Sequence, residues 1–267
     1  MKVRVAVAQM KIERDILKNL KKVEKFLREA KKFKADIIVF PEYFLEPTLS
    51  KSLRFRVAGL IKDVQQLAKK YSIFIVGSNP EFEKGKWYNT AYLISNKGKI
   101  IGKHRKIFLM PKELELGFSR GIKIRVFKTR FGKVAIPVCW DAFNPYSPEL
   151  MRKFKIMGAD FVFIPSYSLK FKESSPINVK NWLYSHCTWN DFYIVLSSNV
   201  GKPIPIKSFG HSLIICPERG ILKEGSENKE ELLIEDLDTK ILRRAEKFDR
   251  QFVNAYVEAA KEMKMIK

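Results

Sequence analysis

Short apolar strands alternate with amphipathic helices along the chain. Residues 3–9 (VRVAVAQ) alternate apolar with polar or small side chains, which predicts a strand. A helix follows, because apolar residues then recur every three or four positions. These residues are Ile16, Leu20, Val23, Leu27, Ala30 and Phe33. The apolar run at 36–40 predicts a short buried strand that ends at Pro41.

Hairpins interrupt this alternation. A second amphipathic helix is predicted over 53–68, and Asn96-Lys97-Gly98 predicts a tight turn between two strands. Further strands are predicted at 73–78, 87–95, 99–105, 161–165 and 192–198. Two more, KIRVF (123–127) and KVAIPV (133–138), flank a turn at Phe131-Gly132. The last two, 211–216 and 231–237, are predicted to be joined through Pro217-Glu218-Arg219-Gly220. Helices are predicted near 147–157 and 177–190 and at the C-terminus.

Strands, helices and hairpins in this order predict a layered α/β protein with both parallel and antiparallel pairing. No linker rich in Pro, Gly or Ser interrupts the chain, so we expect a single domain over residues 1–267. Two stretches, ADIIVFPE at 35–42 and ADFVFIPS at 159–166, have the same outline. Both follow a predicted helix, which indicates an internally duplicated sheet architecture.

Composition limits the class of protein. The chain has 267 residues, 46% of them hydrophobic, which is enough for a large core. No apolar run approaches the ~20 residues of a membrane-spanning helix, and the N-terminus lacks the apolar stretch of a signal peptide. We therefore expect a soluble cytoplasmic protein without a membrane partner. The three cysteines form neither a disulfide framework nor a zinc motif, so we expect no metal.

The formal net charge is +22, which could attract nucleic acid or another polyanion. The lysines are nevertheless spread through every segment and mixed with glutamate. The chain also has no RNA-binding motif and no basic tail of low complexity. Nucleic acid is therefore disfavoured as the main partner, and a polyanion-binding protein is kept as a lesser alternative.

Three chemically reactive residues follow apolar strands: Glu42, Lys106 and Cys139. In α/β proteins, sites are commonly built at such strand ends. A glutamate beside an apolar wall can be a general base, a thiol can attack a carbonyl or nitrile carbon, and a lysine can stabilise the oxyanion. Each residue alone also fits a plainer interpretation, as a core thiol, a surface charge or a loop carboxylate. The periodic pattern does not show whether the three strand ends lie close together in space. Both the catalytic interpretation and the plainer one therefore stay open.

Three blocks of the sequence resemble the signature blocks of the nitrilase superfamily, the carbon–nitrogen hydrolases. They are ADIIVFPE (35–42), GKHRKIFL (102–109) and GKVAIPVCWD (132–141), and they occur in the family's order and at similar spacing. Further similar segments cover nearly the whole chain. The resemblance implies a four-layer α-β-β-α sandwich of two mixed β-sheets with outer helices. It also implies a homodimer or larger homo-oligomer and a mechanism without a cofactor.

Residue roles follow from the same resemblance. Glu42 would be the general base, Lys106 would stabilise the oxyanion, and Cys139 would form a thioester or thioimidate that water hydrolyses. A second glutamate after the lysine is assigned to Glu113 in preference to Glu115. The implied substrate is a small non-peptide amide, carbamoyl compound or nitrile, with an amide favoured.

Aromatic residues close to the three blocks are predicted to line the substrate pocket. The predicted substrate-binding residues are Trp140, whose N–H would complete the oxyanion hole, Tyr43, Phe143 and Tyr167, with Phe44, Tyr146 and Trp189 as further candidates. The helix after Cys139 carries apolar residues that fit either a dimer interface or the core. These are Leu150, Met151, Phe154 and Met157.

Three positions depart from the family pattern or from a regular strand. Phe108 stands where histidine is frequent, and Trp189 stands where glutamate is frequent. Pro137 removes a backbone donor just before the cysteine, which indicates a kinked or edge position. The first two departures favour the alternative of an inactive binding or scaffold protein that keeps the fold.

Overall fold

The computed structural model describes residues 1–46, 51–169, 175–202 and 207–243, together with 259 and 262. The strands are β1 (Lys2–Lys11), β2 (Ile37–Glu42), β3 (Phe74–Glu83), β4 (Lys86–Ile94), β5 (Ile100–Arg105), β6 (Phe127–Thr129), β7 (Gly132–Ala135), β8 (Phe161–Ser166), β9 (Tyr193–Val200), β10 (Leu213–Cys216), β11 (Gly220–Glu224) and β12 (Glu231–Asp238). The helices are α1 (Ile16–Lys32), α2 (Lys51–Tyr71), α3 (Pro111–Glu115), the 3₁₀ helix η1 (Cys139–Ala142), α4 (Ser147–Ile156) and α5 (Pro176–Asn190).

The strands pair in the order β5-β4-β3-β2-β1-β9-β8-β7-β6, with β12 beside β1, and β10 between β9 and β11. Pairs such as β1–β2 and β8–β9 are parallel, whereas β3–β4 and β6–β7 are antiparallel. The predicted α/β class with mixed pairing is thus confirmed. Among the described residues, the β1 half pairs with the β9 half at two positions, Met10↔Asn199 and Lys11↔Val200. The paired strands therefore form one continuous 12-stranded sheet with a narrow junction.

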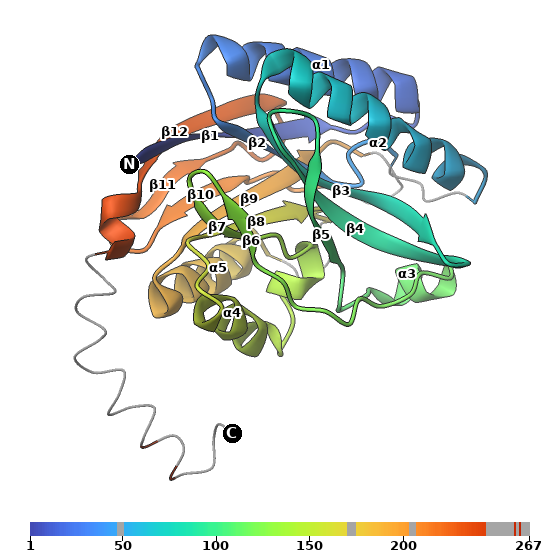
Figure 1. Ribbon diagram of the computed structural model, residues 1–267. Helices are drawn as coiled ribbons and strands as arrows, with labels where there is room; N and C mark the ends of the chain where they lie inside the picture. The colour runs from blue at the N-terminus through green and yellow to red at the C-terminus, as the bar shows by residue number, and fades with distance from the viewer. Residues whose placement is uncertain (47–50, 170–174, 203–206, 244–258, 260–261, 263–267) are drawn as a thin grey trace.

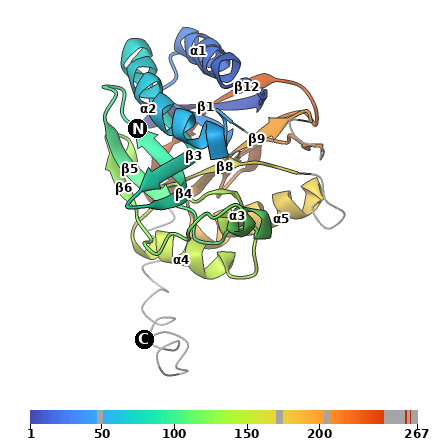
Figure 2. The same ribbon diagram turned by 90° about the vertical axis from the view of Figure 1, so that its right-hand side faces the viewer.

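The central strands of each half of the sheet are buried on both faces. One core cluster combines side chains from both halves, including Val5 and Val39 from the first and Phe163 and Val195 from the second. The opposite face of the first half packs against α1 and α2, and the opposite face of the second packs against α4 and α5. Figure 1 and Figure 2 show these two helix pairs on opposite sides of the strands. Burial on both faces explains why the central strands are almost continuously apolar.

The first helix follows its sequence signals closely. Asp15 caps its start by accepting hydrogen bonds from the N–H groups of Leu17 and Lys18. Most of the expected apolar face is buried, and Leu20 is partly buried. The last member, Phe33, is 50% exposed because the helix ends at Lys32 and Phe33 lies beyond it. The periodic pattern was therefore extended one residue too far.

Two predictions about the later strands are wrong. Residues 211–216 were expected to connect through one turn to 231–237, but β10 forms a hairpin with β11, and β12 pairs antiparallel with β1. Strand β11 (GILKE) is partly exposed and lacks a long apolar run, so the pattern did not reveal it. In addition, β6 begins only at Phe127, after the predicted strand KIRVF has almost ended. The predicted C-terminal helix falls largely outside the described residues.

Helix α4 lies against the core. Leu150, Met151 and Phe154 are buried beside the strands, which favours the core interpretation over the interface for these three residues, while Met157 is 37% exposed. None of the helices in the described ranges combines the length and the apolar character needed to cross a membrane.

Candidate active site

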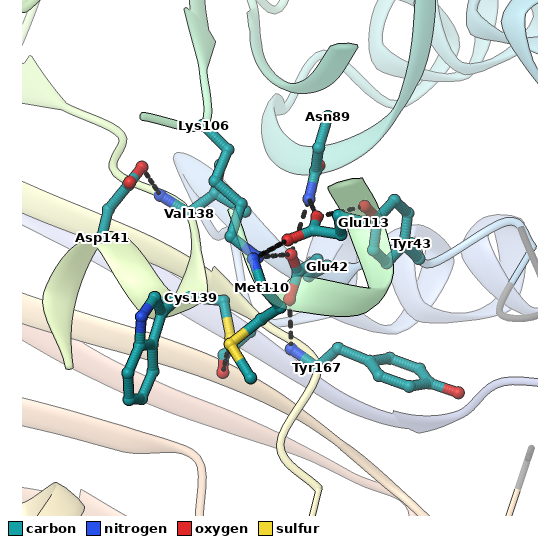
Figure 3. Close-up of polar contacts among 12 residues, drawn as sticks. Glu42, Tyr43, Asn89, Lys106, Met110, Glu113, Val138, Cys139, Asp141 and Tyr167 are labelled. Carbon is teal, nitrogen blue, oxygen red and sulfur yellow. Dashed lines mark hydrogen bonds and ion pairs between the residues drawn. The ribbon is translucent and has the colours of Figure 1, made fainter. Parts of the chain in front are cut away.

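Four of the predicted site residues meet at one end of the strands. Glu42 is the last residue of β2, Lys106 follows β5 directly, Glu113 lies in α3, and Cys139 begins η1 after β7. Figure 3 shows Glu42, Lys106 and Glu113 pointing toward one another. Residues from three separate sequence blocks therefore form one cluster.

Lys106 is a buried cation between two carboxylates. Its Nζ donates to Oε1 of Glu42 and to Oε2 of Glu113, both at 2.8 Å. Burial acts to lower the pKa of Lys106, but the two carboxylates outweigh it and hold that pKa well above its ordinary value. Lys106 therefore stays an ammonium at any pH near neutrality.

Asn89 ties the two carboxylates together from β4. Its Nδ2 donates to Oε1 of Glu42 at 2.6 Å and to Oε1 of Glu113 at 2.8 Å. Its backbone carbonyl accepts from the N–H of Lys106 at 2.8 Å. This residue was missed from the sequence, although Asn89-Thr90 is a polar pair inside an otherwise apolar strand. Fully buried, Asn89 holds three members of the cluster in place.

Glu113 is fixed on every side. It accepts hydrogen bonds from the hydroxyl of Tyr43 at 2.5 Å and from the N–H of Met110 at 2.8 Å. Burial acts to raise the pKa of Glu113, but Lys106 and these donors keep it below its usual range. Glu113 therefore remains a carboxylate. The side chain of Glu115 points to solvent, 62% exposed, and pairs with Lys112 instead.

The pKa of Glu42 is raised, in contrast to that of Glu113. Burial, reinforced by the negative charge of Glu113, raises the pKa of Glu42 above its ordinary value, although Lys106 opposes the shift. Its Oε2 also accepts the backbone N–H of Tyr167 at 2.9 Å. A carboxyl group with a raised pKa can accept and return a proton near neutral pH, as a general base must.

Cys139 occupies a constrained turn next to this carboxylate. Its φ of 44° lies in the left-handed region, which a residue with a side chain rarely adopts. Burial and the charge of Glu42 raise the pKa of the Cys139 thiol to about 12, against the opposing effect of Lys106. The free thiol is therefore protonated at neutral pH and needs a base. Because Trp140 lies in the first turn of η1, its N–H has no acceptor within the helix.

Asp141 connects the cysteine turn to the lysine segment. Its fully buried carboxylate accepts the backbone N–H groups of Ile107, Phe108 and Val138 and lies 3.0 Å from Nε2 of His104. These contacts span the segment after Lys106 and the residue before Cys139. Sequence reasoning quoted the VCWD block but gave Asp141 no role, because nothing in the pattern shows which backbone groups it meets.

The residues that were predicted to line the pocket differ in orientation and in burial. Tyr43 points its hydroxyl at Glu113, and Trp140 is partly buried beside the core under α4 and α5. Phe143 packs in that core, and the ring of Tyr167 extends away from Lys106 in Figure 3. Among the further candidates, Phe44 is buried in the core beside α1 and α2, whereas Tyr146 is 66% and Trp189 75% exposed. Their closeness in sequence to the blocks was a weak guide to orientation.

The two residues that depart from the family pattern lie in different surroundings. Phe108 stacks on Tyr146 with 6.1 Å between ring centroids, and Trp189 faces solvent on α5. Glu42, Lys106 and Glu113 hydrogen-bond to one another although both positions differ from the family pattern. The departures therefore give little support to an inactive binding protein. Within the described ranges, no group of three or more His, Cys, Asp or Glu side chains is arranged to hold a metal ion.

Comparison with known proteins places this geometry in context. Residues 4–247 match the model of the carbon–nitrogen hydrolase family. A nitrilase of Pyrococcus abyssi is 30% identical over 90% of this chain and 92% of its own length. The omega-amidase NIT3 of Saccharomyces cerevisiae is 26% identical over 90% of this chain and 89% of its own. The crystal structure of Saccharomyces cerevisiae Nit3, a member of branch 10 of the nitrilase superfamily, superposes with a TM-score of 0.81, covering 94% of each chain at 27% identity.

Proposed function

The chain belongs to the carbon–nitrogen hydrolase family, and from that premise we propose that it hydrolyses small non-peptide amides through a covalent intermediate on Cys139. The observation that carries the proposal is the convergence of Glu42, Lys106 and Cys139 at one end of the strands. The family supports hydrolysis of C–N bonds other than peptide bonds. The assignment of each residue's role is ours.

The first step needs a base because the thiol is neutral. As Cys139 Sγ bonds to the amide carbon, its proton passes to the carboxylate of Glu42, and the carbonyl π electrons move to oxygen. The raised pKa of Glu42 supports this transfer, since it brings the two proton affinities closer together. When the C–N bond breaks, Glu42 returns the proton to the leaving nitrogen, so ammonia or an amine departs and a thioester remains.

Positive charge and an N–H donor stabilise the oxyanion in this scheme. Lys106 supplies the fixed charge, and the N–H of Trp140 supplies a donor beside the nucleophile. Glu113 and Asn89 hold Lys106 and Glu42 in place, and the hydroxyl of Tyr43 in turn holds Glu113. Because the ammonium group of Lys106 is already held in place, the site does not have to reorganise when the oxyanion forms.

Water completes the cycle through the same groups. Glu42 takes a proton from water as the oxygen attacks the thioester carbon. The second oxyanion collapses, the C–S bond breaks, and the sulfur regains its proton from Glu42. The products are a carboxylic acid and the ammonia or amine released earlier, and no cofactor enters the proton balance.

An amide is the favoured substrate class. The relatives at 25–30% identity include an omega-amidase, a nitrilase and an N-carbamoylputrescine amidase, so a nitrile or carbamoyl compound is the alternative within the same chemistry. The fixed charge of Lys106 suits the full oxyanion that an amide carbonyl develops. The predicted role in lining the substrate pocket stays a prediction for Trp140, Tyr43, Phe143 and Tyr167. Phe143 is buried in the core, where it would support the turn after Cys139.

Several expectations from the sequence remain proposals of the same kind. We propose that the two halves of the strand set, with their outer helix pairs, constitute the four-layer α-β-β-α sandwich of two mixed sheets. A single domain, a homodimer or larger homo-oligomer, and a cytoplasmic location likewise stay predictions.

Replacing the base tests the proposed function directly. We expect wild-type protein to release ammonia from a panel of short amides, carbamoyl compounds and nitriles, and Glu42→Gln to lose about 10²- to 10⁴-fold in kcat/KM. Because the base must be ionised, wild-type kcat/KM should fall as the pH drops through the raised pKa of Glu42. Glu115→Gln, at an exposed position, is the matched control. Equal ammonia release by Glu42→Gln and wild type would exclude Glu42 as the base.

A further inference from the structure

A row of buried hydroxyl groups lies behind Cys139. Ser166 is the last residue of β8, Ser168 follows two residues later, and Ser198 lies in the neighbouring strand β9. Each of these side chains is almost fully buried, with exposed fractions of 1%, 4% and 0%. Buried hydroxyls need defined partners, so their hydrogen bonds carry information about the site.

At one end of this row of hydroxyl groups, Ser166 contacts the sulfur of Cys139. Ser166 Oγ donates to Sγ of Cys139 at 3.4 Å and lies 3.1 Å from Oγ of Ser168. Ser168 Oγ donates to Oγ of Ser198 at 2.9 Å, and its backbone N–H is fixed by Oδ1 of Asn199 at 2.9 Å. A hydroxyl has one proton, and that of Ser168 is engaged with Ser198. The contact between Ser166 and Ser168 therefore uses the proton of Ser166, which is shared between Oγ of Ser168 and the sulfur. The sulfur becomes the stronger acceptor of the two as negative charge develops on it.

The sulfur otherwise lies in unfavourable surroundings for negative charge. Burial and Glu42 both oppose a thiolate, and Lys106 already donates to two carboxylates. Two side chains hydrogen-bond with this sulfur: Glu42 opposes a negative charge on it, whereas the hydroxyl of Ser166 donates to it and favours that charge. Hydrogen bonds to a charged acceptor are stronger than those to a neutral one, so this contact strengthens as the sulfur gains charge.

The duplicated sheet places this hydroxyl opposite the base. The stretches ADIIVFPE and ADFVFIPS end β2 at Pro41-Glu42 and β8 at Pro165-Ser166. Both terminal side chains interact with Cys139, one through its charge and one through its hydroxyl. Matched strand ends therefore bring a carboxylate and a donor to the same thiol.

We propose that Ser166 is a further catalytic residue whose hydroxyl donates to the sulfur of Cys139 as negative charge develops there, when the thiol is deprotonated and when the thioester collapses. Ser168 is a positioning residue that holds the Ser166 side chain beside the sulfur. This inference rests on the proposed role of Cys139 and assigns a specific stabilising group to it.

The rate of Cys139 alkylation tests this role without a substrate. The second-order rate with iodoacetamide is measured by peptide mass mapping from pH 6 to 9, beside kcat and KM for an amide. We expect Ser166→Ala to lower the alkylation rate and kcat by about 10- to 100-fold, with little change in KM, and Ser166→Thr to restore much of both. The control is Ser197→Ala, because Ser197 is equally buried but donates to the carbonyl of Ala8.

The outcomes separate this inference from the proposed function. Wild-type alkylation rates in Ser166→Ala, together with an inactive Cys139→Ala, overturn the role of Ser166 and leave the function intact. An active Cys139→Ala overturns the function itself. Thermal unfolding shows whether each variant folds. If Ser166→Ala does not fold, Ser168→Ala replaces it: this change removes the support of the Ser166 side chain and should also lower the alkylation rate, and an unchanged rate would overturn the role of Ser166.

Discussion

Cys139→Ala is expected to lower kcat/KM for amide hydrolysis by on the order of 10⁴- to 10⁶-fold. Removing the sulfur removes the only step that joins the enzyme to the acyl group in the proposed scheme. The charged cluster of Glu42, Lys106 and Glu113 does not depend on the thiol for its hydrogen bonds, so the fold should persist. Ammonia release on the substrate panel measures the loss, and urea unfolding checks stability.

The matched control is another cysteine of the same chain. Cys216 is fully buried in the core between the two halves of the sheet. It ends β10, which runs antiparallel to β9, so it lies next to the start of β9 rather than near Ser198 and the candidate site. Cys216→Ala should cost stability through lost packing and retain most of the activity. If Cys139→Ala turned over amides as fast as Cys216→Ala, covalent catalysis at Cys139 would be excluded.

Lys106→Met is the second change with a large expected effect. Removing one partner of a buried ion pair leaves uncompensated charge, which typically destabilises a protein by about 3–5 kcal/mol. The loss of oxyanion stabilisation should in addition lower kcat by about 10²- to 10³-fold. Urea unfolding and steady-state kinetics measure the two effects separately.

The destabilisation should depend on pH in a defined direction. Without Lys106, the pKa values of the buried carboxyls rise above their unfolded values, so ionising them costs stability. The loss is therefore smallest at low pH and grows as the pH rises toward neutrality. The double variant Lys106→Met/Glu113→Gln carries one carboxylate fewer and should recover stability without activity. Equal stability of wild type and Lys106→Met at pH 8 would contradict the ion-pair arrangement.

Sequence analysis predicted which reactive residues belong to the candidate site, but it did not predict the residues that hydrogen-bond to them. Each of Glu42, Lys106 and Cys139 follows an apolar strand, and the order of the three blocks resembles a known family. Asn89 and Ser166, by contrast, act through neighbours that are distant in sequence. Periodicity shows which face a residue occupies, but it does not show which strand ends lie side by side. Such residues become visible only through the strand order β4-β3-β2-β1-β9-β8.

The errors in the fold have a similar origin. Strand β11 was missed because a short, partly exposed strand buries little apolar surface and leaves no strong pattern. The aromatic residues near the blocks were assigned together to a pocket, yet Tyr43 and Tyr167 point in different directions and Trp189 faces solvent. Side-chain orientation depends on local backbone geometry, such as the positive φ of Tyr43.

Mass spectrometry of the acylated enzyme tests the central claim most directly. Protein mixed with an amide that it hydrolyses is quenched in acid within the first turnovers and digested, and each peptide is weighed. The proposed mechanism predicts that the mass of the acyl group appears on Cys139 and is absent from Cys139→Ala. An acyl group on a different residue of an actively hydrolysing enzyme would contradict it.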